Sequence, residues 1–210
     1  MVAVTGGEPL IRPDLFDVLA EVGRLKFPWG MVTNGMAVDD RVVEKCLETG
    51  MRTVVVSLDG LEESHNWLRN NPTSYQNATH ALELFVSAKK FDVVEAITCV
   101  SYKNIDQLEL VYQRLRDLGA DSWRLFTIFP KGRANQNPEL FSNRELIIRL
   151  FEFIKQKRLQ DPKWPVNYSE EGYLGCGYEG EVRDELYYCA AGIHIGGLLC
   201  NGDYSACPSL

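Results

Sequence analysis

Strand-like and helix-like segments alternate five times along the first 160 residues, and this rhythm constrains the fold more than any other feature of the sequence. Each apolar, β-branched stretch is followed by a segment with apolar residues at helical spacing, at intervals of roughly 25 to 30 residues. The expected strands are 2–4, 29–35, 52–60, 93–100 and 123–129. Such alternation predicts an α/β fold with a parallel sheet, as in a barrel or an open doubly wound sheet.

Helices are expected at 12–26, 39–48, 74–89, 104–118 and from 142 to about 159, and 62–71 is a loop or short helix. Asn104 is the expected N-cap of the fourth helix. Ser142 is the expected N-cap of the fifth, with Glu145 at the capping-box position. The segment 161–166 ends the regular pattern. We therefore expect a main domain at 1–160, followed by a linker and a small region at 161–210.

Bulk properties exclude several classes of protein. The formal net charge of −7 argues against a nucleic-acid binder or an anionic-membrane binder, because phosphate neutralisation needs a basic surface. No apolar run approaches the roughly 18 residues of a membrane span, and no signal peptide is evident. The cytoplasm is therefore the expected compartment. Dinucleotide and P-loop sites also lack support, because neither glycine motif follows any strand.

Polar residues recur where the expected strands end, which predicts one site ringed by strand ends. They are Gly6 to Glu8, Thr33 and Asn34, Ser57 to Asp59, and Ser101. Two consecutive glycines leave main-chain groups open to a ligand, and a carboxylate beside them suits a ligand with an ammonium group. An ordinary turn with a solvated glutamate is the alternative for this segment.

The six cysteines are unevenly placed. Cys46 and Cys99 lie within an expected helix and strand, so both are interpreted as packed small hydrophobes. The other four lie in the last 35 residues, at Cys176, Cys189, Cys200 and Cys207. This clustering points to a metal site rather than to disulfides, with zinc and iron–sulfur equally compatible. The histidines His65, His80 and His194 have no nucleophile nearby in sequence and are not expected to be catalytic.

Three segments in order, T-G-G-E-P-L-x-R-P-D-L, V-T-N-G and V-S-L-D-G, resemble the radical S-adenosylmethionine (radical SAM) enzymes over residues 2–160. The resemblance implies a partial parallel (β/α)6 TIM-like barrel that misses its first strand. It also implies contacts of Gly6, Gly7, Glu8 and Pro9 with the methionine end of S-adenosylmethionine. Thr33 and Asn34 line that site, Ser57 and Asp59 lie near the ribose or carboxylate, and Arg69 pairs with the carboxylate.

By this resemblance the intact protein is an enzyme. It would reductively cleave S-adenosylmethionine to a 5′-deoxyadenosyl radical, which would modify a peptide or protein side chain. The electron donor would be a flavodoxin or ferredoxin. The family holds its catalytic [4Fe–4S] cluster with a C-x-x-x-C-x-x-C loop, and these 210 residues contain no such loop. We therefore expect a fragment truncated at both ends that is inactive by itself.

The C-terminal cysteines add to the resemblance. Cys189 and Cys207 stand in a C-x12-G-x4-C pattern with Gly202, which resembles the opening of the SPASM extension and its auxiliary iron–sulfur clusters. The resemblance implies that Cys189 and Cys207 are metal ligands on a tight hairpin, while Cys176 and Cys200 have no assigned position. The rival hypothesis is a non-catalytic α/β binding protein whose cysteine tail holds zinc or free thiols.

Overall fold

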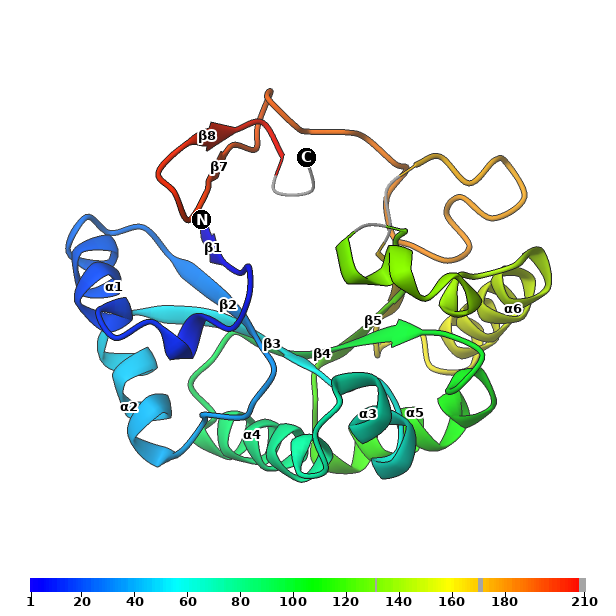
Figure 1. Cartoon of the computed structure of the whole chain (residues 1–210), viewed down its shortest axis with the longest axis horizontal. Helices are drawn as coiled ribbons and strands as arrows, with labels where there is room; N and C mark the ends of the chain where they lie inside the picture. The colour runs from blue at the N-terminus through cyan, green and yellow to red at the C-terminus, as the bar shows by residue number, and fades with distance from the viewer. Residues whose placement is uncertain (131, 170–171, 208–210) are drawn as a thin grey trace.

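The computed structural model of the chain describes residues 1–130, 132–169 and 172–207. Its centre is one curved sheet of six parallel strands that are adjacent in chain order (Figure 1). The strands are β1 (Val2–Val4), β2 (Trp29–Thr33), β3 (Met51–Ser57), β4 (Val93–Val100), β5 (Ser122–Thr127) and β6 (Val166–Tyr168). Each strand pairs in parallel with the next. The predicted α/β partial barrel is therefore confirmed.

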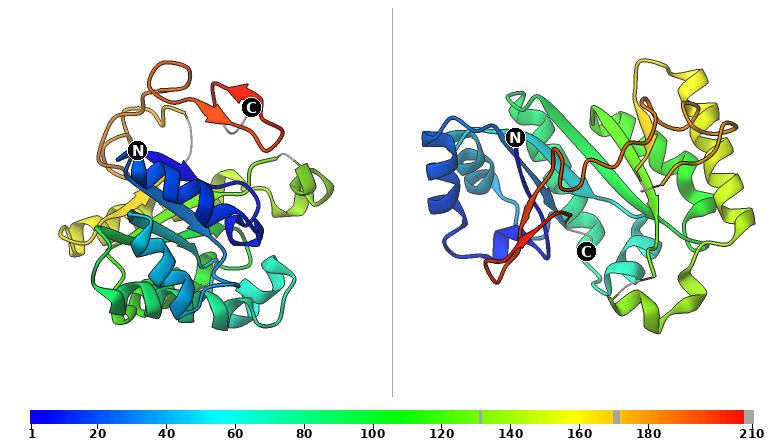
Figure 2. Two further views of the ribbon diagram at one scale, coloured as in Figure 1. Left: turned by 90° about the vertical axis from the view of Figure 1, so that its left-hand side faces the viewer. Right: turned by 90° about the horizontal axis from the view of Figure 1, so that it is seen from above.

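All long helices lie on the convex side of this sheet, and none covers its concave side (Figures 1 and 2). They are α1 (Leu15–Arg24), α2 (Asp40–Glu48), α3 (Glu62–Arg69), α4 (Ser74–Ala88), α5 (Leu108–Leu118) and α6 (Arg144–Gln160). Short 3-10 turns, η1 to η4, lie at Pro9–Ile11, Ile105–Gln107, Gly132–Gln136 and Pro138–Leu140. No helix in the described ranges has the length and apolar character needed to cross a bilayer.

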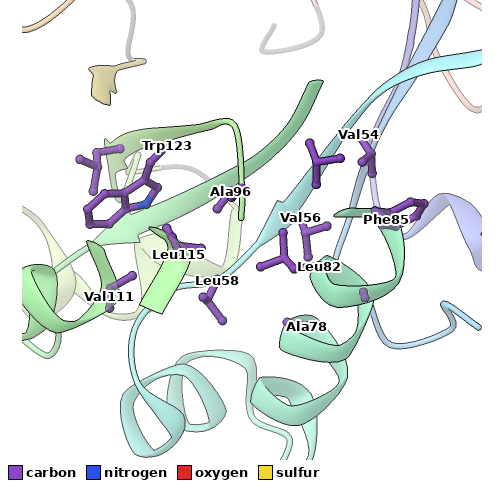
Figure 3. Packing of buried hydrophobic residues seen from close by; sticks show 14 of the residues in the cluster. Val54, Val56, Leu58, Ala78, Leu82, Phe85, Ala96, Val111, Leu115 and Trp123 are labelled. Carbon is purple, nitrogen blue, oxygen red and sulfur yellow. The ribbon is translucent and has the colours of Figure 1, made fainter. Parts of the chain in front are cut away.

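The core fills the space between the sheet and these helices. Alternate residues of β3, Val54 and Val56, face Leu82 and Phe85 of α4, and all four are wholly buried (Figure 3). Trp123 of β5 is wholly buried in the same core. Burying each such side chain stabilises the fold by roughly 1.5–3 kcal/mol. Because successive strand residues face opposite sides, the residues between these positions line the concave side of the sheet.

Two expectations about the chain after residue 100 are wrong. The N-cap of α6 is Asn143 rather than Ser142, and its side chain accepts a 2.9 Å hydrogen bond from Leu146 N–H. Asn104 does not cap a helix with its side chain, because that side chain turns back and bonds to the ends of β3 and β4. The sequence also gave no sign of the short strand β6.

The C-terminal region leaves β6 and arches over the concave side of the sheet (Figures 1 and 2). Val182 is fully buried in the main core, and Tyr178 packs on Phe151 of α6 with ring centroids 4.8 Å apart. Further on, β7 (Gly197–Leu198) and β8 (Tyr204–Ser205) form the expected antiparallel hairpin. The domain boundary after residue 160 stays a prediction.

Candidate functional site

The Glu8 side chain joins the ends of β1 and β2. Its Oε1 accepts hydrogen bonds from Thr33 Oγ1 at 2.8 Å and from Leu10 N–H at 3.2 Å, and its Oε2 accepts one from Asn34 N–H at 2.7 Å. Thr33 Oγ1 in turn accepts a bond from Gly35 N–H. A carboxylate has about four lone-pair positions, so three protein bonds leave about one for a ligand. Glu8 is thus a structural bridge with one acceptor position left.

The glycine pair before Glu8 is open to solvent. Gly6 has a φ of +122°, a conformation that side-chain-bearing residues rarely adopt. A Cβ atom added at Gly7 would meet no protein atom within 4 Å. Pro9, in contrast, is buried as the first residue of η1. The glycines therefore expose main chain beside the Glu8 carboxylate, while Pro9 shapes the turn.

At the end of β3, the wholly buried Asp59 holds Arg69 of α3. Asp59 Oδ2 accepts a 2.5 Å bond from Arg69 Nε, and Asp59 Oδ1 accepts a 2.9 Å bond from Cys99 N–H on β4. No described residue bonds to the two terminal nitrogens of Arg69, whose side chain is 33% exposed. The guanidinium is therefore fixed at one edge and open at the other.

His65 of α3 lies behind Asp59. Its Nδ1 accepts a 2.9 Å hydrogen bond from Asp59 N–H, and the imidazole is 1% exposed. Burial lowers the pKa of His65, and the nearby Asp59 carboxylate only partly offsets this effect. The imidazole is therefore neutral at pH 7.

Of the groups described above, Asp59 and Arg69 line a cavity of about 590 Å³ at the carboxyl ends of the strands. Its polar lining includes Asn34, Asp59 and Arg69, and Cys99 also lines it. Its apolar lining includes Leu68, Phe126, Ile128 and Leu140. Asn34 Oδ1 accepts a bond from Met36 N–H, while its amide nitrogen has no partner among the described residues. The site thus offers a ligand both hydrogen-bond donors and apolar surface.

The structure does not gather every predicted site residue at this cavity. Ser57 is buried at the last position of β3 and is not among the described residues that line it. The described lining residues also do not include five other predicted residues, Gly6, Gly7, Glu8, Pro9 and Thr33. Cys189 and Cys207 lie on the C-terminal arch, Cys189 exposed and Cys207 half-buried. In the ranges 1–130, 132–169 and 172–207, no three His, Cys, Asp or Glu side chains come together as a metal site. The roles assigned to these residues stay predictions.

Several residues of the site were missed in the sequence. Cys99 lines the cavity rather than packing in the core, so its interpretation as a packed residue is wrong. The signal was present, because Cys99 alternates with the buried Thr98 and Val100 along β4. Phe126 and Ile128 follow the same alternation after Leu125. His65 carried no sequence signal, since its partner is a main-chain N–H.

Comparison with known sequences identifies one family. The family profile described as "Radical SAM superfamily" matches residues 1–115, more than half of the chain. The AdoMet-dependent heme synthase of Methanosarcina barkeri is 29% identical over 161 residues, covering 75% of this chain and 45% of that protein. The pre-heme d1 synthase of Dinoroseobacter shibae is 27% identical over 135 residues, covering 64% and 33%.

Solved structures share the fold. SuiB of Streptococcus suis aligns with a TM-score of 0.74 at 16% identity, covering 99% of this chain and 50% of that one. Native anSMEcpe with bound AdoMet aligns with a TM-score of 0.62 at 22% identity, covering 79% and 48%. The chain spans about half or less of the length of these relatives and structures.

Proposed function

Because this chain belongs to the radical SAM superfamily, we propose that it forms the S-adenosylmethionine-binding core of an enzyme that modifies peptide or protein side chains. The observation that carries the proposal is the 590 Å³ cavity, where Asp59 fixes Arg69 with its terminal nitrogens open to a ligand. Enzymes of this superfamily use S-adenosylmethionine and a [4Fe–4S] cluster. The activity, substrate and partners of the whole protein are proposals.

The donor set fits the methionine end of S-adenosylmethionine, which carries an ammonium and a carboxylate. The remaining acceptor position of Glu8 and the exposed carbonyls of Gly6 and Gly7 would hold the ammonium. Arg69 would hold the carboxylate through its terminal nitrogens, since a guanidinium matches a carboxylate with two parallel bonds. Asn34 would donate its free amide N–H groups. Thr33 and Pro9 would support this arrangement without direct contact.

The apolar lining fits the rest of the molecule. Phe126 and Ile128 would supply apolar surface to the adenine ring, and the Phe126 ring could stack on it. We place Ser57 and Asp59 beside the ribose, as residues at and just after the end of β3. Asp59 would act mainly through Arg69, because its two carboxylate oxygens already accept protein bonds.

In the superfamily, bound S-adenosylmethionine is cleaved reductively and supplies a 5′-deoxyadenosyl radical that abstracts a substrate hydrogen. The cluster that delivers the electron is held by three cysteines, and these residues contain no C-x-x-x-C-x-x-C loop. The present side chains therefore fit S-adenosylmethionine but do not provide that cluster's ligands. We expect the 210 residues alone to bind S-adenosylmethionine weakly and not to cleave it. A flavodoxin or ferredoxin remains the proposed electron donor.

A peptide substrate is favoured by the structural relatives. One SuiB structure holds the precursor peptide SuiA, and one anSMEcpe structure holds the Kp18Cys peptide. Here the C-terminal arch passes over the concave side of the sheet (Figure 2). We further propose that Cys189 and Cys207 contribute to an auxiliary iron–sulfur cluster in a SPASM-like region, with zinc as the alternative metal.

A tetrapyrrole substrate is the second candidate, because the curated relatives that we compared are heme and pre-heme d1 synthases. Absorption spectroscopy distinguishes the two candidates. The absorption spectrum of a carboxylate-bearing porphyrin should shift when the porphyrin binds this chain. Addition of an unstructured peptide library should not change the spectrum of the porphyrin. Micromolar porphyrin binding that excess S-adenosylmethionine strengthens would favour the tetrapyrrole.

Calorimetric titration of the full chain with S-adenosylmethionine tests the binding proposal. The decisive variant is Arg69→Gln, which we expect to weaken binding at least about tenfold, as for a lost bond to a charged group. Arg52→Gln is the matched control, because Arg52 also pairs with an aspartate through Nε, at 2.7 Å to Asp92, but at the opposite end of β3. Absence of binding by the unaltered chain, or equal loss in both variants, would refute the proposal.

Metal analysis of the purified chain tests the C-terminal cysteines separately. After anaerobic reconstitution with iron and sulfide, iron retained by the unaltered chain and lost in Cys189→Ala supports the cluster. Cys46→Ala is the control, because Cys46 is buried in α2. Zinc at one atom per chain in place of iron would favour the alternative.

A further inference from the structure

His65 accepts a main-chain hydrogen bond at the end of β3. The preceding N–H, that of Leu58, donates to the carbonyl of Ile97 on β4 at 2.9 Å. The next N–H, that of Asp59, donates instead to His65 Nδ1, at the same distance. A side chain from α3 thus holds the main chain at the point where the sheet ends.

The acceptor role of Nδ1 defines the chemical form of His65. A neutral imidazole that accepts at Nδ1 carries its proton on Nε2. Nε2 is buried and makes no hydrogen bond within the described residues, although the Ser74 backbone lies near enough to raise the pKa of His65 slightly. Among the described residues, the Asp59 N–H is therefore the one that holds this ring by a hydrogen bond, and the ring also packs against Tyr75 in a T-shaped contact.

Asp59 has all of its polar atoms engaged. Its carboxylate accepts bonds from Arg69 and from Cys99 N–H, and its carbonyl accepts one from the Asn104 side chain. Gly60 follows with a φ of +154°, and a Cβ atom there would lie 2.3 Å from Ser64 Oγ. The position of the Asp59 carboxylate therefore depends on the main chain, which His65 and Asn104 hold from two sides.

We propose that His65 is a positioning residue, which holds the Asp59 main chain so that Asp59 directs the Arg69 guanidinium into the cavity. In this role the neutral imidazole acts through a single atom, Nδ1. The proposal rests on the proposed function in one respect, namely that the ligand of the cavity is S-adenosylmethionine. The position of Asp59 can be tested independently, because amide exchange reports on it without any ligand.

Two substitutions separate the role of Nδ1 from the bulk of the ring. In His65→Asn the amide oxygen is attached to Cγ, as Nδ1 is in histidine, so the acceptor is kept. In His65→Gln the amide lies one bond farther out and corresponds to Nε2, so the acceptor beside Asp59 N–H is lost. Both side chains are polar and smaller than histidine, so they remove similar packing.

Amide hydrogen exchange of the full chain gives the ligand-free readout. The Cys99 N–H reports on the Asp59 carboxylate, and we expect its protection to fall about tenfold in His65→Gln and to stay near the original value in His65→Asn. The Ala96 N–H at the centre of β4 is the reference. Unchanged Cys99 protection in His65→Gln, or equal loss in both variants, overturns the proposal.

Calorimetric titration with S-adenosylmethionine gives the second readout. We expect an increase in the dissociation constant of about tenfold for His65→Gln and of less than about threefold for His65→Asn. Equal weakening in both variants counts against positioning through Nδ1. If the unaltered chain does not bind S-adenosylmethionine, the proposed function fails, while Cys99 exchange still decides the role of His65.

A measurement on the unaltered chain covers the case in which His65→Gln does not fold. Nitrogen-15 chemical shifts of the imidazole distinguish the two neutral tautomers. We expect the proton on Nε2 at pH 7. A proton on Nδ1 would be incompatible with acceptance from Asp59 N–H and would overturn the proposal.

Discussion

Glu8 Oε1 accepts a 2.8 Å hydrogen bond from Thr33 Oγ1, a contact that joins the loop after β1 to the end of β2. The two residues are 25 positions apart in the chain, and Thr33 is 1% exposed. A carboxylate that would contact a ligand is therefore also a support of the protein that presents it. Substitutions at Glu8 should consequently change both stability and ligand binding.

For Glu8→Gln we expect a decrease in the free energy of unfolding of about 1–3 kcal/mol, because an amide NH2 group would face donors that now bond to the carboxylate. Binding of S-adenosylmethionine should weaken at least about tenfold as the counter-charge for its ammonium is lost. Urea unfolding and calorimetry measure the two effects. Glu44→Gln on the exposed side of α2 removes the same charge and should change neither. Unaltered binding by Glu8→Gln would contradict this prediction.

Two glycine substitutions should separate folding from binding. Gly60→Ala should lower the free energy of unfolding by about 1–3 kcal/mol, because the new Cβ atom would lie 2.3 Å from Ser64 Oγ. Gly7→Ala should change stability by less than about 0.5 kcal/mol, because its Cβ atom would meet no protein atom within 4 Å. It should nevertheless weaken binding of S-adenosylmethionine. Thermal unfolding measures the change in stability, and calorimetry measures the affinity for S-adenosylmethionine. Unchanged affinity in Gly7→Ala would show that the ligand does not bind beside Gly7.

The buried His65 should make stability depend on pH. Burial lowers its pKa in the folded protein, so between that value and the unfolded value of about 6.5 the unfolded chain binds more protons. Stability should therefore be complete above pH 6.5 and fall as the pH decreases, by at most about 1.4 kcal/mol per pH unit from this residue. Urea unfolding at several pH values between 5 and 8 measures the slope.

Replacement of the histidines assigns this slope. His65→Asn should remove the His65 contribution between pH 5 and 6.5. His80→Asn should leave the slope unchanged, since the His80 side chain is 60% exposed. An identical slope in His65→Asn and the unaltered chain would show that His65 titrates alike in the folded and unfolded states.

Cysteine alkylation should report on the occupied cavity. Cys99 lines the cavity, so saturating S-adenosylmethionine should slow its modification by iodoacetamide. Cys46 should not react in the folded chain, because burial raises the pKa of its thiol to about 12 and excludes the reagent. The exposed Cys176, Cys189 and Cys200 should react at the same rate with and without the ligand. Mass spectrometry of digests at timed intervals measures each rate, and equal rates for Cys99 would contradict the assigned cavity.

Most strands and helices were predictable because their signals are local. The buried run of β3 and the apolar face of α4 are visible in windows of 7 to 15 residues. The strand β6 has only three residues, directly after Pro165, and forms because β5 offers it a partner. Its assignment depends on a neighbour more than 40 residues earlier in the chain, so no local pattern predicted it.

The site was predictable only in part. Asn34, Asp59 and Arg69 line the cavity. The recurrence of polar residues near strand ends indicated the first two, and the family resemblance implied Arg69. Ser57 is the last residue of β3, two positions before Asp59, but it is buried and does not line that cavity within the described residues. Asn104 was expected to cap a helix, and it instead bonds to the carbonyls of Asp59 and Cys99. The hydrogen bonds between strand ends therefore decide which polar side chains face the cavity, and the sequence does not show these bonds.

The amino-acid order alone determined the α/β class, the parallel arrangement and the family, because periodicity and short motifs are properties of neighbouring residues. Only the tertiary structure decided that Glu8 bridges two strand ends, that His65 accepts a bond from Asp59 N–H, and that no described residue bonds to the terminal nitrogens of Arg69. These features depend on hydrogen bonds across 6 to 45 residues, whose formation requires the curved sheet to bring the strand ends together. The sequence therefore predicted candidate residues of the site, whereas the tertiary structure determined which groups each of them contacts.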